Sequence, residues 1–169
     1  MIIRPETPRD VAAVHAVHEH AFGQLLEADL VAKLRRHCRE ALSLVAESGG
    51  HVQGHILFTP VVIEHQTGPV VGMGLGPMAV LPERQRQGIG SALVRHGLDT
   101  LRERGCPFVI VVGHPEYYPR FGFEPAAKHA LRCQWESVAG AAFMVLILDG
   151  ATMADVSGVV TYRPEFSEE

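Results

Sequence analysis

The stretch LPERQRQGIGSALVRHGLDTL, from Leu81 to Leu101, decides which fold to expect. A polar segment, ERQRQ, runs into Gly88 and Gly90, and an amphipathic helical pattern follows. Glycine is disfavoured in a helix by roughly 1 kcal/mol relative to alanine, so glycines at a helix start indicate that bare backbone is needed there. The first N–H groups of a helix have no intrahelical partner and carry partial positive charge, which suits a phosphate. We therefore expect an anion site at this helix start.

Two common phosphate-binding loops do not fit this stretch. The Walker pattern requires Lys and then Ser or Thr after its last glycine, whereas Gly90 is followed by Ser91 and Ala92. The dinucleotide pattern GxGxxG is supplied neither by GMGLG nor by GIGSAL. These mismatches argue against a P-loop nucleotide hydrolase and against a dinucleotide-dependent oxidoreductase.

The rest of the chain alternates between strand and helix patterns. The predicted elements are a short strand near Ile2, a helix that Thr7 caps, a helix near residues 27–39, the strands ALSLVAE, HVQGHILFTPVVIEH and GMGLGPMAVLP, the helix that ends near Gly105, the buried strand FVIVV, a helical turn at residues 117–121 and the strand AFMVLIL. A tight hairpin is expected at Ser48-Gly49-Gly50. This order predicts one α/β domain with a mixed sheet and helices on both faces.

Composition excludes several classes of protein. The chain has 169 residues and a formal net charge of −4, which gives no reason to expect nucleic acid or an anionic membrane as a partner. It shows no apolar signal core and no uninterrupted apolar run of about 20 residues. Three widely spaced cysteines, Cys38, Cys106 and Cys133, suit reduced thiols. We expect a cytoplasmic protein.

The opening stretch resembles the acyl-CoA loop of the GCN5-related N-acetyltransferases (GNAT), whose motif Q/R-x-x-G-x-G/A is matched by Gln85, Gly88 and Gly90. The later segment YYPRFGF resembles the Tyr-x-x-x-Gly-Phe arrangement that ends the family's core. Together, LGPMAVLPE, GIG and YYPRFGFEPA look most like a bacterial subgroup of predicted N-acetyltransferases, with agreement from about Ile2 to Leu148. The resemblance implies a single-domain GNAT fold over residues 1–169, with a mixed, mostly antiparallel central sheet flanked by helices on both faces.

The resemblance also implies where acetyl-CoA binds. Backbone groups of Met78, Ala79 and Val80 would pair with pantetheine as though it were another strand. Pro77 suits a bulge beside this position, because proline cannot donate to a sheet ladder. Arg86 would lie at the rim of the pyrophosphate site, whose backbone amides would come from Gln87, Gly88, Ile89, Gly90 and Ser91.

Acetyl transfer needs a neutral amine, a donor to the oxyanion and a proton for the thiolate. The family keeps its thiolate-protonating tyrosine at the position of Tyr118, with Tyr117 as the alternative, and the Val80 N–H is the candidate oxyanion donor. Neutralising an amine of pKa near 10.4 at pH 7 costs about 5 kcal/mol, so a base is useful. The family's usual base positions are not matched. His114 and Glu116 are candidates, and water or an amine supplied in the neutral form are equally open.

Several histidines lie close together in the sequence and raise the question of a metal-binding site, which the sequence does not favour. His15 and His18 share a helix face in HAVHEH, but no acidic or cysteine ligand is placed with them, so we expect no metal and surface or partly buried imidazoles. His51, His55 and His65 alternate with apolar residues in predicted strands and are expected to be structural. For His55 the alternative is a side chain that points into the substrate cleft.

The sequence therefore predicts an acetyl-CoA-dependent N-acetyltransferase whose acceptor amine attacks the thioester directly. The acceptor is a small molecule or a peptide, and the protein is a monomer or a homodimer with no nucleic-acid or membrane partner. The alternative is a non-catalytic acyl-CoA-binding module that senses the cofactor or regulates a partner. Tyr118 favours the enzyme, and the missing base keeps the alternative open.

Overall fold

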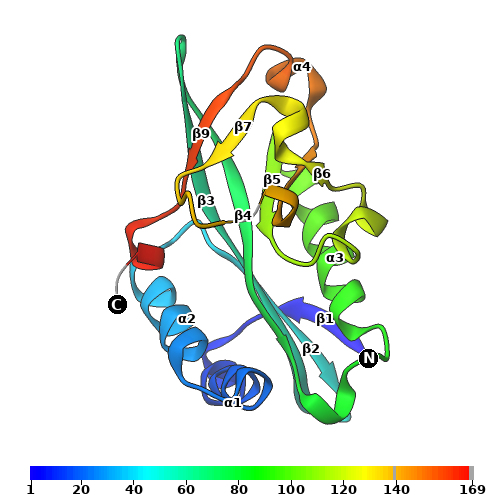
Figure 1. Ribbon diagram of the computed structural model, residues 1–169. Coiled ribbons are helices and arrows are strands. Elements are labelled where there is room, and N and C mark those ends of the chain that lie inside the picture. The colour runs from blue at the N-terminus through cyan, green and yellow to red at the C-terminus, as the bar shows by residue number, and fades with distance from the viewer. Residues whose placement is uncertain (139, 168–169) are drawn as a thin grey trace. The chain divides into compact units, whose positions relative to one another are not determined.

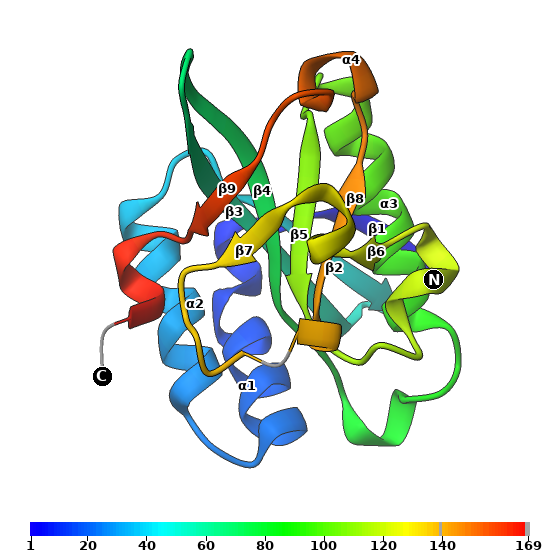
Figure 2. The same cartoon turned by 45° about the horizontal axis from the view of Figure 1, so that its top comes forward.

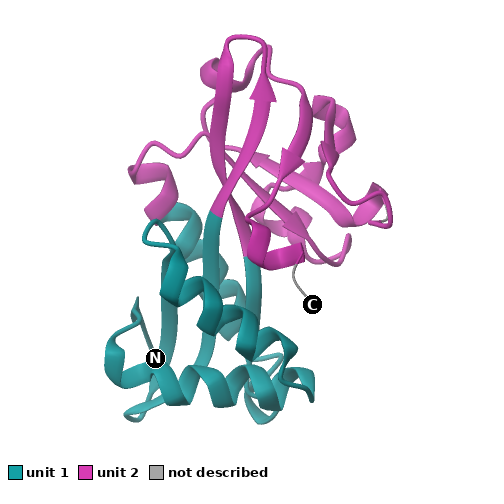
Figure 3. Cartoon of the chain, turned by 90° about the vertical axis from the view of Figure 1, so that its left-hand side faces the viewer, with its two compact units in different colours: residues 1–59, 76–99, 168–169 teal, residues 60–75, 100–167 magenta. Residues whose placement is uncertain are grey.

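The structure is a computed structural model that describes residues 1–138 and 140–167. These residues form two compact units, which Figure 3 colours separately. The first unit holds Met1–Thr59 and Gly76–Asp99, and the second holds Pro60–Leu75 and Thr100–Ser167. The two long strands, β3 (His51–His65) and β4 (Gly68–Val80), contribute residues to both units. The units are therefore interleaved along the chain rather than consecutive.

The sheet of the first unit is antiparallel. Strand β2 (Leu42–Ser48) pairs with β1 (Ile2–Pro5) and with the first part of β3. Gly49 and Gly50 connect β2 to β3 with φ values of 59° and 80°. Glycine adopts this left-handed region without the steric penalty of a Cβ, so the expected tight hairpin is confirmed.

Helices cover both faces of β3 in the first unit. A Cβ added at Gly97 in α3 (Ile89–Glu103) would lie 2.3 Å from Cε1 of Phe58, so α3 packs directly on the face that carries this ring. Successive strand side chains alternate between faces, so His55 points to the opposite face. There it contacts His18 of α1 (Val11–Phe22), which is followed by α2 (Leu26–His37).

The second unit is a mixed sheet (Figures 1 and 2). Strand β5 (Phe108–Val112) pairs in parallel with β4 and antiparallel with β8 (Phe143–Ile147), which also pairs antiparallel with β6 (Glu124–Pro125). Strand β9 (Gly158–Thr161) pairs antiparallel with β3 and in parallel with β7 (Leu131–Cys133). Residues 108–111 are at most 1% exposed, as expected for a strand covered on both faces. The α/β fold with a mixed, mostly antiparallel sheet and flanking helices is confirmed.

The sequence does not predict every element. It misses β6, β7 and β9, as well as α4 (Gly150–Met153), and each of these has at most four residues. Segments this short contain too few side chains to show a periodic pattern. Strand β4 also begins at Gly68 rather than at Gly72, where the predicted strand begins.

The described residues also bear on the thiols and on membrane insertion. No disulfide joins Cys38, Cys106 and Cys133. Burial raises the pKa of the Cys106 and Cys133 thiols, which keeps them in the protonated, less reactive form. Within residues 1–138 and 140–167, no helix combines the length and the apolar character needed to cross a membrane.

Candidate active site

The loop between β4 and α3 has the backbone shape of an anion site. After β4, a 3₁₀ turn (Pro82–Arg84) leads through an exposed segment to the helix. Arg86 and Gly88 have φ values of 65° and 87°, so the chain bends sharply twice before α3 begins. The side chain of Gln85 donates to the Val80 carbonyl at 3.0 Å, and that of Gln87 donates to the Glu83 carbonyl at 3.2 Å. Gln85 therefore ties the loop to the end of its own strand, and Gln87 ties it to the 3₁₀ turn.

The helix start leaves backbone donors without helical acceptors. The first helical hydrogen bond on this side runs from the Ala92 N–H to the Gly88 carbonyl at 3.0 Å. The N–H groups of residues 88–90 therefore precede the repeating ladder, where a helix carries partial positive charge. A Cβ added at Gly88 would meet nothing within 4 Å, so this glycine leaves open space beside the donors. The arrangement suits a phosphate or pyrophosphate.

Ile89 fixes the helix to the sheet beneath it. Its side chain is 7% exposed, and its Cγ2 atom lies 3.2 Å from the position of a Cβ added at Gly54 on β3. The predicted contribution of Ile89 to cofactor binding would therefore come from its backbone, while its side chain belongs to the core. Gly90 and Ser91 are half-buried beside it.

The end of β4 supplies the predicted pantetheine strand. Ala79 is 5% exposed, whereas Met78 and Val80 are half-buried. The Leu81 N–H donates to the Gln53 carbonyl of β3 at 2.9 Å, which ties the strand end to the sheet. Pro77, which follows a cis bond from Gly76, has no N–H to donate.

Tyr118 lies in the second unit, at the start of a 3₁₀ turn (Tyr118–Phe121) that follows β5. Its ring is 7% exposed and packs edge-on against Tyr117 and Phe123, at centroid distances of 5.0 Å and 5.7 Å. A Cβ at Gly113 would lie 2.4 Å from Cε2 of this ring, so only glycine leaves room for it. Burial, and then the neighbouring Tyr117, raise the pKa of Tyr118 to about 12. Its hydroxyl therefore keeps its proton throughout the physiological range.

His114 begins the turn that holds the two tyrosines. Its carbonyl accepts the N–H groups of Tyr117 and Tyr118 at 3.1 Å and 3.4 Å. The His114 and Glu116 side chains are both exposed beyond the end of β5. The ring of Tyr117 is covered by the Arg120 guanidinium, 4.3 Å from its centroid. The second unit thus gathers the candidate acid and both candidate bases at one strand end.

The histidines of the first unit form a buried hydrogen-bond chain. Nε2 of His18 lies 2.8 Å from Nδ1 of His55, whose Nε2 atom lies 2.8 Å from the Ser43 hydroxyl. Ser43 donates to the Glu6 carboxylate at 2.6 Å, and Arg35 pairs with the same carboxylate. Because Ser43 has one proton, it accepts from His55, and His55 in turn accepts from His18.

This series of buried hydrogen bonds corrects the expectation that His18 is a surface or partly buried residue. His18 and His55 are both fully buried, and burial lowers the pKa of each, that of His18 to about 4. The hydrogen bonds of His55 to His18 and Ser43 agree with the expectation that His55 is structural. They do not agree with the alternative, in which its side chain points into a substrate cleft. Among the described residues, no group of three or more His, Cys, Asp or Glu side chains could hold a metal ion.

The comparison with known proteins identifies the family. The model of the acetyltransferase (GNAT) domain matches residues 2–126. The chain belongs to the GNAT acetyltransferase family. YhbS of Escherichia coli strain K12, described as an uncharacterised N-acetyltransferase, is 39% identical to this GNAT protein over 168 residues, which cover 99% of each chain.

Two solved GNAT structures are similar over nearly the whole chain. One is that of E. coli YhbS in complex with CoA, with a TM-score of 0.90, 37% identity, and coverage of 99% of this chain and 92% of that one. The other is a GNAT acetyltransferase from Brucella melitensis in complex with acetyl-CoA, with a TM-score of 0.78, 36% identity, and coverage of 98% and 97%. The predicted family and the classification as an N-acetyltransferase are confirmed.

Proposed function

We propose that this GNAT protein transfers the acetyl group of acetyl-CoA to an amine, which attacks the thioester directly. The observation that carries the proposal is the loop at the start of α3, where Gly88 leaves open space beside backbone N–H groups. The CoA and acetyl-CoA in the YhbS and B. melitensis structures support the same cosubstrate here.

The loop residues would bind the pyrophosphate through their backbone. The amides of Gln87, Gly88, Ile89, Gly90 and Ser91 would donate to it, with Arg86 at the rim. Met78, Ala79 and Val80 would pair with pantetheine through the backbone of β4. This division assigns binding to main-chain groups that the fold already holds in place.

The chemistry needs two donors from this chain. The Val80 N–H would donate to the oxyanion of the tetrahedral intermediate, and the Tyr118 hydroxyl would donate to the departing thiolate. Because the pKa of Tyr118 is about 12, its hydroxyl is protonated at the start of every turnover. His114 or Glu116 would accept the amine proton, directly or through water, since both stand at the same strand end as Tyr118.

Thiol release from acetyl-CoA in the presence of a panel of primary amines tests this function. We expect amine-dependent release, with one N-acetylated product per thiol by mass spectrometry. Tight acetyl-CoA binding without transfer to any amine would contradict the enzyme and favour the non-catalytic acyl-CoA-binding module. The cytoplasmic location and the monomeric or homodimeric state remain predictions.

A further inference from the structure

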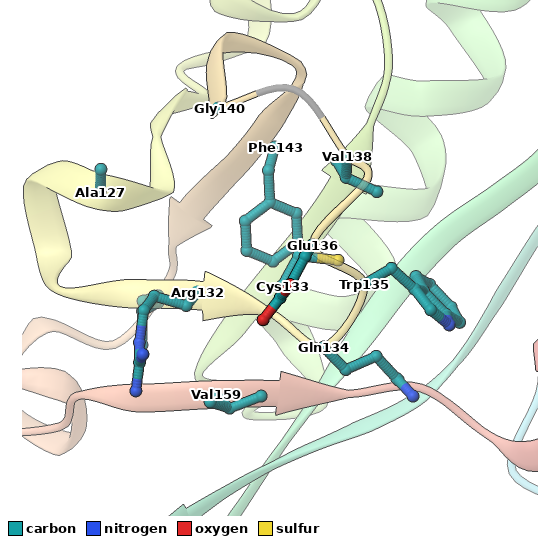
Figure 4. A pocket seen from close by; sticks show the side chains of 11 residues that line it. Ala127, Arg132, Cys133, Gln134, Trp135, Glu136, Val138, Gly140, Phe143 and Val159 are labelled. Carbon is teal, nitrogen blue, oxygen red and sulfur yellow. The ribbon is translucent and has the colours of Figure 1, made fainter.

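A pocket of about 420 Å³ lies in the second unit around strand β7 (Figure 4). We call it the β7 pocket. Its apolar lining includes Leu131, Val138 and Phe143, and its charged lining consists of Arg132 and Glu136. Leu131 and Phe143 are only 2% and 4% exposed, so they form a firm apolar floor. The volume suits a small ligand.

One wall of the β7 pocket is held in place by contacts outside it. The Gln134 side chain accepts the Tyr162 N–H at 2.5 Å. The Trp135 ring packs against the Tyr162 ring at a centroid distance of 4.9 Å. These contacts anchor the irregular segment after β7 to the end of β9.

The β7 pocket and Tyr118 flank the same end of β5. Phe143 is in register with Val112, and the Gly113 N–H donates to the Ala142 carbonyl at 2.9 Å. The side chains of Phe108 and Ile110 join the core cluster that contains Phe143. By alternation, Gly113 faces the other side, where the Tyr118 ring packs. A thioester next to Tyr118 would therefore lie across a strand end from the pocket.

The β7 pocket carries two charges of opposite sign. Within the described residues, the side chains of Arg132 and Glu136 form no ion pair with each other and no hydrogen bond or ion pair with another residue. Both are exposed, and Arg132 stands beside Val159 on the paired strand (Figure 4). The apolar floor and the two unused charges match a ligand with an apolar body, one anionic group and one ammonium group.

We propose that the β7 pocket binds the acceptor, an α-amino acid with an apolar side chain, with Arg132 on its carboxylate and Glu136 on its ammonium group. This inference rests on the proposed acetyl transfer and names its substrate class. In the reaction the amine nitrogen bonds to the acetyl carbon, and the bond from that carbon to sulfur breaks. Of the two protons that the ammonium group loses, one goes to the thiolate and one to solvent.

The decisive test compares each amino acid with its amide, which lacks the anionic group. Phenylalanine, leucine and methionine are each assayed against their amides by thiol release at saturating acetyl-CoA. We expect kcat/KM to favour the acid by about 10-fold or more, because a charge-assisted bond to Arg132 is lost in the amide. Arg132→Gln should remove this preference, so that acid and amide react alike. Arg104→Gln, an exposed arginine of the same unit outside the pocket, is the matched control and should keep the preference.

Glu136→Gln tests the second charge. It should raise KM for the amino acid about 10-fold while changing KM for acetyl-CoA far less. Glu103→Gln, at the exposed end of α3, is its control. Equal rates for acid and amide in the wild type, or a preference that survives Arg132→Gln, would overturn the proposal while leaving acetyl transfer intact. Acetyl-CoA binding with no transfer to any amine would instead overturn the proposed function.

Discussion

Tyr118→Phe removes the hydroxyl that we propose donates to the thiolate, and it removes nothing else. The ring is 7% exposed and lies against Gly113, Tyr117 and Phe123, contacts that phenylalanine retains. The fold and the affinity for acetyl-CoA should therefore change little. The substitution should instead lower kcat.

The structure sets the size of this effect. The pKa of Tyr118, about 12, lies well above that of a free thiol, about 8.5, so full proton transfer to a free thiolate would be uphill by about 5 kcal/mol. The hydroxyl then acts mainly as a hydrogen-bond donor to the developing charge, a contribution of about 1.5–3 kcal/mol. That range corresponds to a fall in kcat of about 10- to 150-fold.

Steady-state thiol release with a saturating amine measures the loss, and Tyr117→Phe is the matched control. The pH profile adds a second readout: because Tyr118 stays protonated, it should cause no fall in the wild-type rate up to about pH 10. Full turnover in Tyr118→Phe with a loss in Tyr117→Phe would transfer the role to Tyr117. Full turnover in both variants would refute the tyrosine mechanism.

Three further predictions concern stability. Between pH 7 and 5 the free energy of unfolding should fall by about 2 kcal/mol on account of His18, because the imidazole takes up a proton near pH 6.5 in the unfolded chain but only near pH 4 when it is buried. Denaturant titrations at several pH values should show that the free energy of unfolding of His18→Leu depends less on pH than that of the wild type. An equal pH dependence in the two proteins would contradict this. Gly97→Ala should destabilise the fold by about 1–3 kcal/mol because of the Phe58 ring, despite the better helix propensity of alanine, and a raised denaturation midpoint would rule out this packing. A reductant should leave the melting temperature unchanged, whereas a drop of several degrees would reveal a disulfide.

The parts of the fold that were predictable from the sequence are those with a long or distinctive local pattern. The strand Phe108–Val112 is a continuous apolar run, and α3 combines a glycine-rich start with a clear helical period. The loop between β4 and α3 was predictable for the same reason, because its shape depends on neighbouring residues such as Gly88.

The parts that were not predictable depend on contacts between distant residues. His18 and His55 are 37 positions apart, and only the packing of α1 on β3 brings their rings together. Apart from Phe143, which lies on the predicted strand AFMVLIL, the β7 pocket is lined by short segments between Ala127 and Gly140 and by Val159, where neither a strand nor a helix period is visible. Pairing of β7 with β9 places Val159 beside Arg132 in the lining of this pocket, and nothing local in either segment indicates the pairing.

The measurement that tests the central claim most directly is acetyl-CoA binding by calorimetry to the wild type, Gly88→Glu and Gly50→Glu. Both glycines have positive φ, 87° and 80°, and a Cβ at either one meets nothing within 4 Å, so the two variants carry the same added charge and a similar backbone strain. Only Gly88 stands where we place the pyrophosphate. We predict that Gly50→Glu binds acetyl-CoA like the wild type, and that Gly88→Glu loses about 100-fold or more in affinity through like-charge repulsion and lost access to the amides. Wild-type affinity in a folded Gly88→Glu variant would contradict the account.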